Sequence, residues 1–277
     1  MKSRMETIQK LDFYVRLYCD TYNNRIRVDE YRGDLHLLHP TLLQKAKEHL
    51  ATKLIVKARG EHVKAFLSYG YVIEGVIDGY FRGSDAWMMA YFLHSKRRES
   101  SVYVEEVDLL QKVLQLENAE LVSSNSLKKA GEGEAEALGQ LYRDTFQLYP
   151  VPLHDPNYIK QAMSEGTIFY YFEKDGEIIS AASAEVNAND YNAELTDCAT
   201  VPSFRKGGLM KQLLQQLEMD LQKEGIFCFY SLARALSFGM NAAFQQLNYS
   251  YRGRLINNCY IFDKLEDMNI WVKSTRI

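Results

Sequence analysis

The spacing of apolar residues predicts helices and strands in mixed order over the C-terminal half of the chain. Between residues 207 and 223 apolar side chains recur on one helical stripe, which predicts a long amphipathic helix. The polar run at 174–177 predicts a hairpin turn between two strands. The full pattern is helix, helix, strand, strand, strand, helix, strand, helix and one or two final strands, over 134–148, 155–163, 167–172, 178–186, 193–201, 207–223, 226–231, 241–246 and 250–262. This order predicts an α/β (α+β) fold, with a mixed central sheet and helices on both faces.

The N-terminal half repeats part of that pattern. Helices at 41–50 and 61–69 flank a buried strand at 53–58, and strands follow near 71–77 and 86–93. The residues around its second helix are similar to those at 232–234 and 247–249. We interpret this as an internal duplication, although any strand-helix-strand unit resembles another.

A polar segment at 115–133 divides the chain. Its small, polar and glycine residues are typical of linkers and surface loops. It predicts an N-terminal α/β domain at 1–122 and a second domain at 123–277.

Composition limits the possible partners. The net charge of −3 gives no basic surface for nucleic acid, and no stretch approaches the ~18 apolar residues of a membrane span. The N-terminus is charged and does not resemble a signal sequence. The cysteines form no CxxC pair, and no histidine is spaced for zinc, which predicts no metal and a cytoplasmic protein with reduced, buried thiols at Cys19, Cys198, Cys228 and Cys259.

The segment 201–214 carries the clearest chemical signal. Arg205 and Lys206 bring positive charge, while Gly207 and Gly208 allow the backbone to approach a ligand. The first N–H groups of the following helix lack intrahelical partners and carry partial positive charge. Such a turn suits a pyrophosphate, although plain glycine-containing strand-to-helix turns are also common.

In context this segment resembles the acetyl-CoA-binding motif of the GNAT N-acetyltransferase superfamily. Arg-x-x-Gly follows Val-Pro and Phe and precedes an amphipathic helix. The resemblance implies a GNAT-like C-terminal domain with acetyl-CoA as co-substrate, and it makes the N-terminal half, which has no intact motif, a degenerate GNAT-like repeat that has lost coenzyme binding. Met210 departs from the usual Gly or Ala and could narrow the phosphate pocket. The residues implied for the coenzyme are Ala199, Thr200, Val201, Arg205, Lys206, Gly207, Gly208, Leu209, Met210, Asn241 and Phe244.

The chemistry requires a base, because a primary amine with a pKa near ~10.4 is almost wholly protonated at pH 7. Glu194 occupies the strand position where histone-acetylating members of the superfamily keep a glutamate base, and Asp197 is the other candidate. On a regular strand these two face opposite sides, so both reach one cleft only if a bulge intervenes. Phe244 stands near the family's usual tyrosine acid, and Tyr249 is a nearby alternative or a core residue. Backbone N–H groups near Ala199 and Val201 are expected to polarise the thioester carbonyl.

A closer resemblance is to the β-lysine ε-N-acetyltransferases. It implies acetylation of β-lysine to N-epsilon-acetyl-β-lysine, a compatible solute, by direct attack in a ternary complex. An Arg fork should bind the substrate carboxylate, and Arg234 is the first choice, with Arg252 and Arg254 as alternatives. Asn257 and Asn258 could hold the β-amino group. The matching segments are 18–20, 31–33, 231–235, 239–241, 253–259 and 266–273.

Other substrates and functions are also compatible with the sequence. The amine substrate could be a polyamine, a lysine side chain or an aminoglycoside, and a non-catalytic acetyl-CoA-binding module is a further alternative. The N-terminal half could serve packing, homodimer formation or one wall of the substrate pocket.

Overall fold

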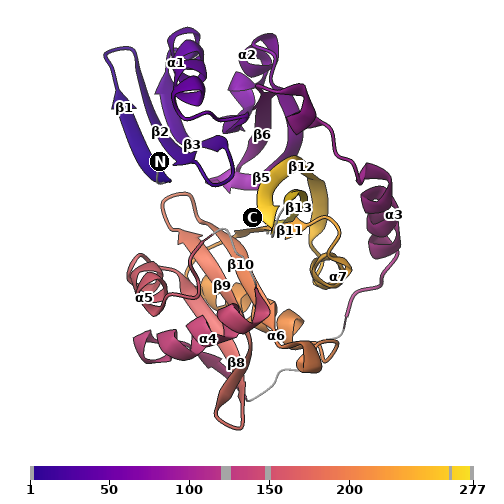
Figure 1. Cartoon of the computed structure of the whole chain (residues 1–277). Coiled ribbons are helices and arrows are strands. Elements are labelled where there is room, and N and C mark those ends of the chain that lie inside the picture. Colours follow the sequence, from indigo (N-terminus) through magenta and orange to yellow (C-terminus); the bar gives the residue numbers. More distant parts are fainter. Residues whose placement is uncertain (1–2, 120–125, 147–150, 262–263, 275–277) are drawn as a thin grey trace.

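One continuous sheet of 13 strands runs through the described residues, which are 3–119, 126–146, 151–261 and 264–274 in this computed structural model (Figure 1). The strand order is β1-β2-β3-β4-β6-β5-β12-β13-β11-β10-β9-β8-β7. The N-terminal strands are β1 (Arg4–Gln9), β2 (Phe13–Asp20), β3 (Arg25–Gly33), β4 (Lys53–Arg59), β5 (Val72–Phe81) and β6 (Ser84–Phe92). The C-terminal strands are β7 (Leu127–Lys129), β8 (Ile168–Lys174), β9 (Glu177–Asn187), β10 (Asn192–Thr200), β11 (Cys228–Arg234), β12 (Ser250–Ile261) and β13 (Lys264–Ser274).

The helices pack on the faces of this sheet. In the C-terminal half one face carries a core with α6 and α7, and the opposite face carries a core with α4 and α5. In the N-terminal half α1 and α2 cover one face. The helices are α1 (Leu35–Glu48), α2 (Val63–Ser68), α3 (Tyr103–Leu114), α4 (Ala135–Thr145), α5 (Pro156–Ser164), α6 (Leu209–Lys223) and α7 (Phe238–Gln246). The predicted α/β class with a mixed sheet is confirmed, and no helix among the described residues is long and apolar enough to cross a membrane.

Three parts of the sheet did not follow from the sequence pattern, and one is the short edge strand β7, which lies within the segment 115–133 that was predicted as a linker. The strands β1, β2 and β3 were not predicted, although Val15, Leu17 and Cys19 alternate between charged or aromatic neighbours and are fully buried. One or two strands were predicted over 250–262, whereas the final region contains two strands, β12 within that range and β13 beyond it. The second of these, β13, lies inside the sheet between β12 and β11.

The two halves of the sheet have the same order of elements. The run β1-β2-β3-β4-β6-β5 matches β8-β9-β10-β11-β13-β12, and the parallel pair β3/β4 matches the parallel pair β10/β11. Helix α1 follows β3 as α6 follows β10, and α2 follows β4 as α7 follows β11. This order supports the interpretation as a duplication. The predicted domain boundary at 122/123 lies outside the described residues and stays a prediction, and α3, which precedes it, packs in the C-terminal core.

The halves join where β5 and β12 meet at Gly75 and Gly253. A Cβ atom on Gly253 would lie 2.3 Å from the carbonyl oxygen of Glu74 and 2.5 Å from the Cα of Gly75, so the two backbones touch. Gly253 also has φ +138, a conformation that side chains rarely adopt. Beside it the fully buried Lys53 pairs with Glu74 at 2.8 Å and donates to the carbonyl of Ile256 at 2.7 Å. The junction therefore needs glycine and one buried ion pair.

Replacing Gly253 by alanine should lower the free energy of unfolding by at least about 2 kcal/mol, because the new Cβ forces the crossing backbones apart and keeps a strained φ. Urea unfolding followed by circular dichroism measures this change. The control is Gly133→Ala, since a Cβ there meets nothing within 4 Å and the loss of chain entropy should leave stability equal or slightly higher. Equal stability of the Gly253→Ala protein and the wild type would contradict this account of the junction.

Candidate active site

A cavity of about 1740 Å³ lies between the two halves. Its C-terminal wall comprises β10, the loop before α6, and the start of α7, and its N-terminal wall is formed by β2, β3 and β4. Sites for one drug-sized ligand usually have roughly 300–1,000 Å³. This cavity therefore has room for a long coenzyme and a small second substrate together.

The strands β10 and β11 separate inside the cavity. They pair with each other in parallel only from Asn192 to Glu194, and beyond that point no hydrogen-bonded pair joins the two strands. A bulge follows in β10, where the register against β9 shifts between Thr196 and Ala199 and Asp197 adopts φ +51. This is the bulge on which the sequence argument depended, and both Glu194 and Asp197 line the cavity.

The loop before α6 lines the cavity with every residue from Arg205 to Met210. Gly208 takes the left-handed conformation at φ +77 as the N-cap of α6, and no side chain caps the helix. Because the first helical bond runs from the Gln212 N–H to the Gly208 carbonyl, the preceding N–H groups lack helical partners. We propose that these groups and the positive charges beside them hold the coenzyme diphosphate. Met210 packs partly against the core.

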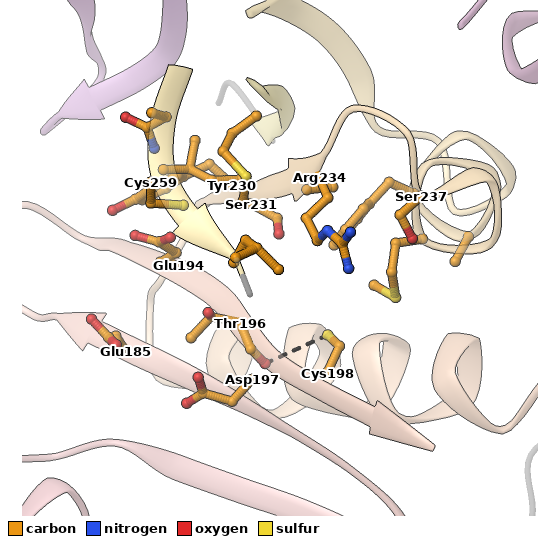
Figure 2. A pocket seen from close by; sticks show the side chains of 18 of the residues that line it. Glu185, Glu194, Thr196, Asp197, Cys198, Tyr230, Ser231, Arg234, Ser237 and Cys259 are labelled. Atoms are coloured by element: carbon orange, nitrogen blue, oxygen red, sulfur yellow. Dashed lines mark hydrogen bonds between the residues drawn. The ribbon is translucent and has the colours of Figure 1, made fainter. Parts of the chain in front are cut away.

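Three carboxylates gather on the C-terminal wall (Figure 2). Glu185 on β9 is the cross-strand partner of Glu194, and Asp197 follows on β10. Burial first, and then the negative charges of Glu194 and Asp197, raise the pKa of Glu185 to about 7. The Asp197 carboxylate accepts a hydrogen bond from Ser183 Oγ at 2.7 Å, so a neighbouring hydroxyl holds it.

Glu185 was not among the sequence candidates. Its signal was the hairpin between β9 and β10, whose register places residue 185 opposite residue 194. An acidic residue opposite a candidate base on the same sheet face is an equally good candidate for the base, because like charges in one buried site perturb each other's pKa.

Three predicted site residues that follow α6 in the sequence do not line the cavity. Tyr249 is buried in the core and donates to Glu218 at 2.7 Å, away from the position of an acid for the leaving thiolate. The side chain of Asn241 is fully buried and fully bonded, to the carbonyls of Arg234 and Ser237 and to the Asn269 and Trp271 side chains. Asn257 donates to the carbonyls of Arg97 and Glu99. These bonds give all three a structural role.

The backbone of β10 is only partly open. Thr200 lines the cavity, whereas Ala199 is buried in the core with α4 and α5. The Val201 N–H donates to the carbonyl of Ile179 at 2.9 Å, so it is not free to polarise a thioester, contrary to the expectation from sequence. Phe244 lines the cavity, and its contact with the coenzyme stays a prediction.

Arg234 lines the cavity, but its guanidinium already binds a carboxylate. Its Nε and Nη2 atoms donate to the two oxygens of Glu266 at 2.6 and 2.7 Å. The alternatives are also paired, Arg252 with Asp78 and the buried Arg254 with Glu106. Asn258 lines the cavity, and its Oδ1 atom is buried without a hydrogen-bond partner among the described residues.

The N-terminal counterpart of the coenzyme gap is closed. The strands β3 and β4 pair through Val28, and beyond that Tyr31 is buried, with its hydroxyl accepting from the Arg59 N–H at 3.2 Å and bonded to His62 at 2.9 Å. Only Asp34 separates β3 from α1, and its carboxylate caps the helix by accepting from the His36 N–H at 2.7 Å. An anion already occupies this helix start, which leaves no place for a phosphate.

A possible metal-ligand group lies outside the cavity. Glu6, Cys19 and His49 bring one ligand atom each within 4.8 Å of one another. Lys45 and Arg4 already neutralise Glu6, and burial raises the pKa of Cys19 to about 11. These contacts describe an ion-pair cluster beneath α1 in which the thiol stays protonated.

Comparison with known proteins agrees with this geometry. A model of the acetyltransferase (GNAT) family matches residues 135–246. The chain is 38% identical to N-acetyltransferase YodP of Bacillus subtilis, over 92% of this chain and 94% of that protein. It is 36% identical to the beta-lysine N(6)-acetyltransferase of Methanosarcina mazei over 80% and 90% of the two chains, and 32% identical to that of Methanococcus maripaludis over 91% and 93%.

The chain therefore belongs to the GNAT family and is an acetyl-CoA-dependent N-acetyltransferase. Within that family its similarity to the β-lysine N6-acetyltransferases extends over most of its length. The expected fold and co-substrate are confirmed, and the reading as an enzyme prevails over the non-catalytic module.

Replacing Gly207 by glutamate should weaken acetyl-CoA binding at least about tenfold, because a carboxylate would stand where we place the diphosphate. The backbone tolerates a side chain there, since a Cβ would make only one ordinary contact, at 3.6 Å. Isothermal titration calorimetry with acetyl-CoA measures the change. Gln222→Glu, which adds the same charge at the exposed far end of α6, should leave affinity unchanged. If both variants bind acetyl-CoA with equal affinity, the diphosphate does not bind at this loop.

Proposed function

We propose that this enzyme transfers the acetyl group of acetyl-CoA to the ε-amine of β-lysine. The names of two relatives that align along most of the chain support this substrate. The observation that carries the proposal is the pair of carboxylates, Glu185 and Glu194, beside the open edge of β10. A cationic amine is drawn to this pair, and one member of it titrates near neutral pH.

The carboxylates divide the work between them. Glu194 attracts the substrate ammonium, and Glu185, with a pKa of about 7, takes its proton. The neutral amine then attacks the thioester carbonyl, and the tetrahedral intermediate expels the coenzyme thiolate. Because Phe244 has no proton to give and Tyr249 is bonded to Glu218, the thiolate takes up the second proton of the attacking nitrogen. Beyond Glu194 β10 no longer pairs with β11, and we assign the pantetheine arm and the thioester oxygen to this edge of the strand.

Direct transfer within a ternary complex is supported by the two thiols that line the cavity, Cys198 and Cys259, because burial raises the pKa of both. Cys198 lines the cavity, but burial first and the charge of Asp197 second raise its pKa well above the ordinary range. A protonated thiol is a poor nucleophile, so an acyl-enzyme on Cys198 is disfavoured. The cavity has room for both substrates at once.

The rest of the substrate also has partners. Asn258 lines the cavity and its buried Oδ1 atom has no hydrogen-bond partner among the described residues, and we assign the β-amino group to it. Acetylation removes the ε-charge, so the product is a zwitterion of zero net charge. Such a molecule raises solute concentration without a counterion, which suits a compatible solute.

The substrate is tested by coenzyme A release from the purified protein with acetyl-CoA and one amine at a time: β-lysine, α-lysine, ornithine or spermidine. We expect a strong preference for β-lysine in kcat/KM. A preference for spermidine would replace the proposal by a polyamine acetyltransferase.

The pH profile tests the base. A carboxyl group with a pKa raised to about 7 is protonated below that pH and cannot accept a proton, so kcat/KM should rise through pH 7 and then level off. Glu185→Gln should lower kcat by roughly 100-fold or more and remove this limb. Glu177→Gln, exposed at the start of the same strand, should change neither quantity. A limb that persists in the Glu185→Gln protein would assign the base to another group.

A further inference from the structure

The N-terminal wall of the cavity is positively charged. Along β3 the side chains alternate, so that Ile26 lies in the core under α1 while Arg25 and Arg27 line the cavity. Lys57 lines it from the neighbouring strand β4. In the C-terminal half, α4 and α5 pack against β8, β9 and the end of β10. The inner face of β3 and β4 is instead turned toward the carboxylates of β9 and β10.

Arg27 has donor capacity that the protein does not use. Its Nε atom is shielded from solvent and has no hydrogen-bond partner among the described residues. Its nearest carboxylate, Asp29, is 3.7 Å away, which is an ion pair but not a hydrogen bond. The guanidinium lies over the ring of Tyr18, 5.1 Å from its centre, which fixes its plane.

The other cations of the N-terminal wall, and Arg234 across the cavity, already have hydrogen-bond partners. Arg25 donates to Asp20 at 2.9 Å and to the carbonyl of Asn258 at 3.0 Å. Lys57 donates to the hydroxyl of Tyr80 at 2.9 Å, a neutral partner that leaves its charge uncompensated. Arg234 is bound by Glu266. Arg27 is therefore the arginine best prepared to receive a new carboxylate.

The charge of Arg27 interacts with the carboxylates on the opposite wall. Burial disfavours its charge, but Asp29, Glu194 and Glu185 outweigh burial and raise the pKa of Arg27. Conversely, the charges of Arg27 and Lys57 lower the pKa of Glu185 against its burial. A ligand between these walls has a cation on one side and carboxylates on the other.

We infer that Arg27, supported by the charge of Lys57, binds the carboxylate of the substrate across the cavity from Glu185 and Glu194. This assignment rests on the proposed function and replaces Arg234 in that role. It makes the N-terminal half the specificity wall of the active site. A diamino acid places its carboxylate on Arg27 and its distal ammonium on the carboxylate pair. A polyamine would bring a second ammonium to Arg27, where like charges repel.

The test compares two substrates that differ only in the carboxylate: β-lysine and 1,4-diaminopentane, which is β-lysine without its carboxyl group. Arg27→Met keeps the apolar stem and removes the charge. For β-lysine its kcat/KM should fall about 10- to 100-fold, mainly through KM, as expected for a lost charged hydrogen bond. For 1,4-diaminopentane it should stay unchanged or rise. Arg32→Met, exposed on the same strand and outside the cavity, should behave as wild type with both.

An equal loss with both substrates would overturn the inference, because Arg27 would then act only on the charge state of Glu185. If wild type turns over 1,4-diaminopentane but not β-lysine, the proposed function itself fails. Acetyl-CoA affinity reports whether the coenzyme site of each variant is intact. If Arg27→Met no longer binds acetyl-CoA, the same two substrates are compared with Arg27→Lys. A loss of kcat/KM with β-lysine alone then supports the carboxylate subsite at Arg27, and an equal effect on both amines overturns it.

Discussion

The active site depends on the contact between β5 and β12, where the backbones at Gly75 and Gly253 meet without side chains between them. This contact makes one sheet of two similar halves, and it brings their inner faces together around a shared apolar core that includes Ile77 and Ile270. The buried Lys53–Glu74 pair ties β4, β5 and β12 at the same place. Buried ion pairs contribute little net stability compared with well-packed apolar residues, so a role in fixing the relative position of the halves is the better explanation of its presence here. The cavity exists because of that position.

Within the cavity, the strand bulge and the charge distribution depend on each other. The irregular register of β10 places Asp197 and Glu194 on one wall, and the register with β9 adds Glu185. So many negative charges in a partly buried space would repel one another, and two features relieve the repulsion. Glu185 binds a proton near neutral pH, and Arg27 and Lys57 face the group from the N-terminal half. The carboxylates that we propose as catalytic are thus tuned by residues about 130 to 170 positions away in the sequence.

Features that depend on contiguous residues were predictable from the sequence, whereas those that depend on pairing between strands were not. The coenzyme loop and α6 were predictable, because glycines, cations and an amphipathic stripe are contiguous there. Glu185 is recognised only from the register of its hairpin. Arg234 and Asn241 looked available because β13 was not predicted, and it is β13 that supplies their partners Glu266, Asn269 and Trp271. Arg27 was missed because β3 was missed, although the alternation of its residues was visible.

The closed gap in the N-terminal half has an evolutionary consequence. In the N-terminal half, which we interpret as a second copy, Tyr31 and Asp34 lie where we propose the coenzyme arm and the diphosphate in the other half, so this copy need not conserve a loop for nucleotide binding. Its inner strands are free to diverge without harming acetyl transfer. Substitutions on β2, β3 and β4 can change which amine is accepted while the reaction machinery of the other copy remains intact. The protein thereby separates selection for chemistry from selection for ligand choice, within a single uninterrupted sheet.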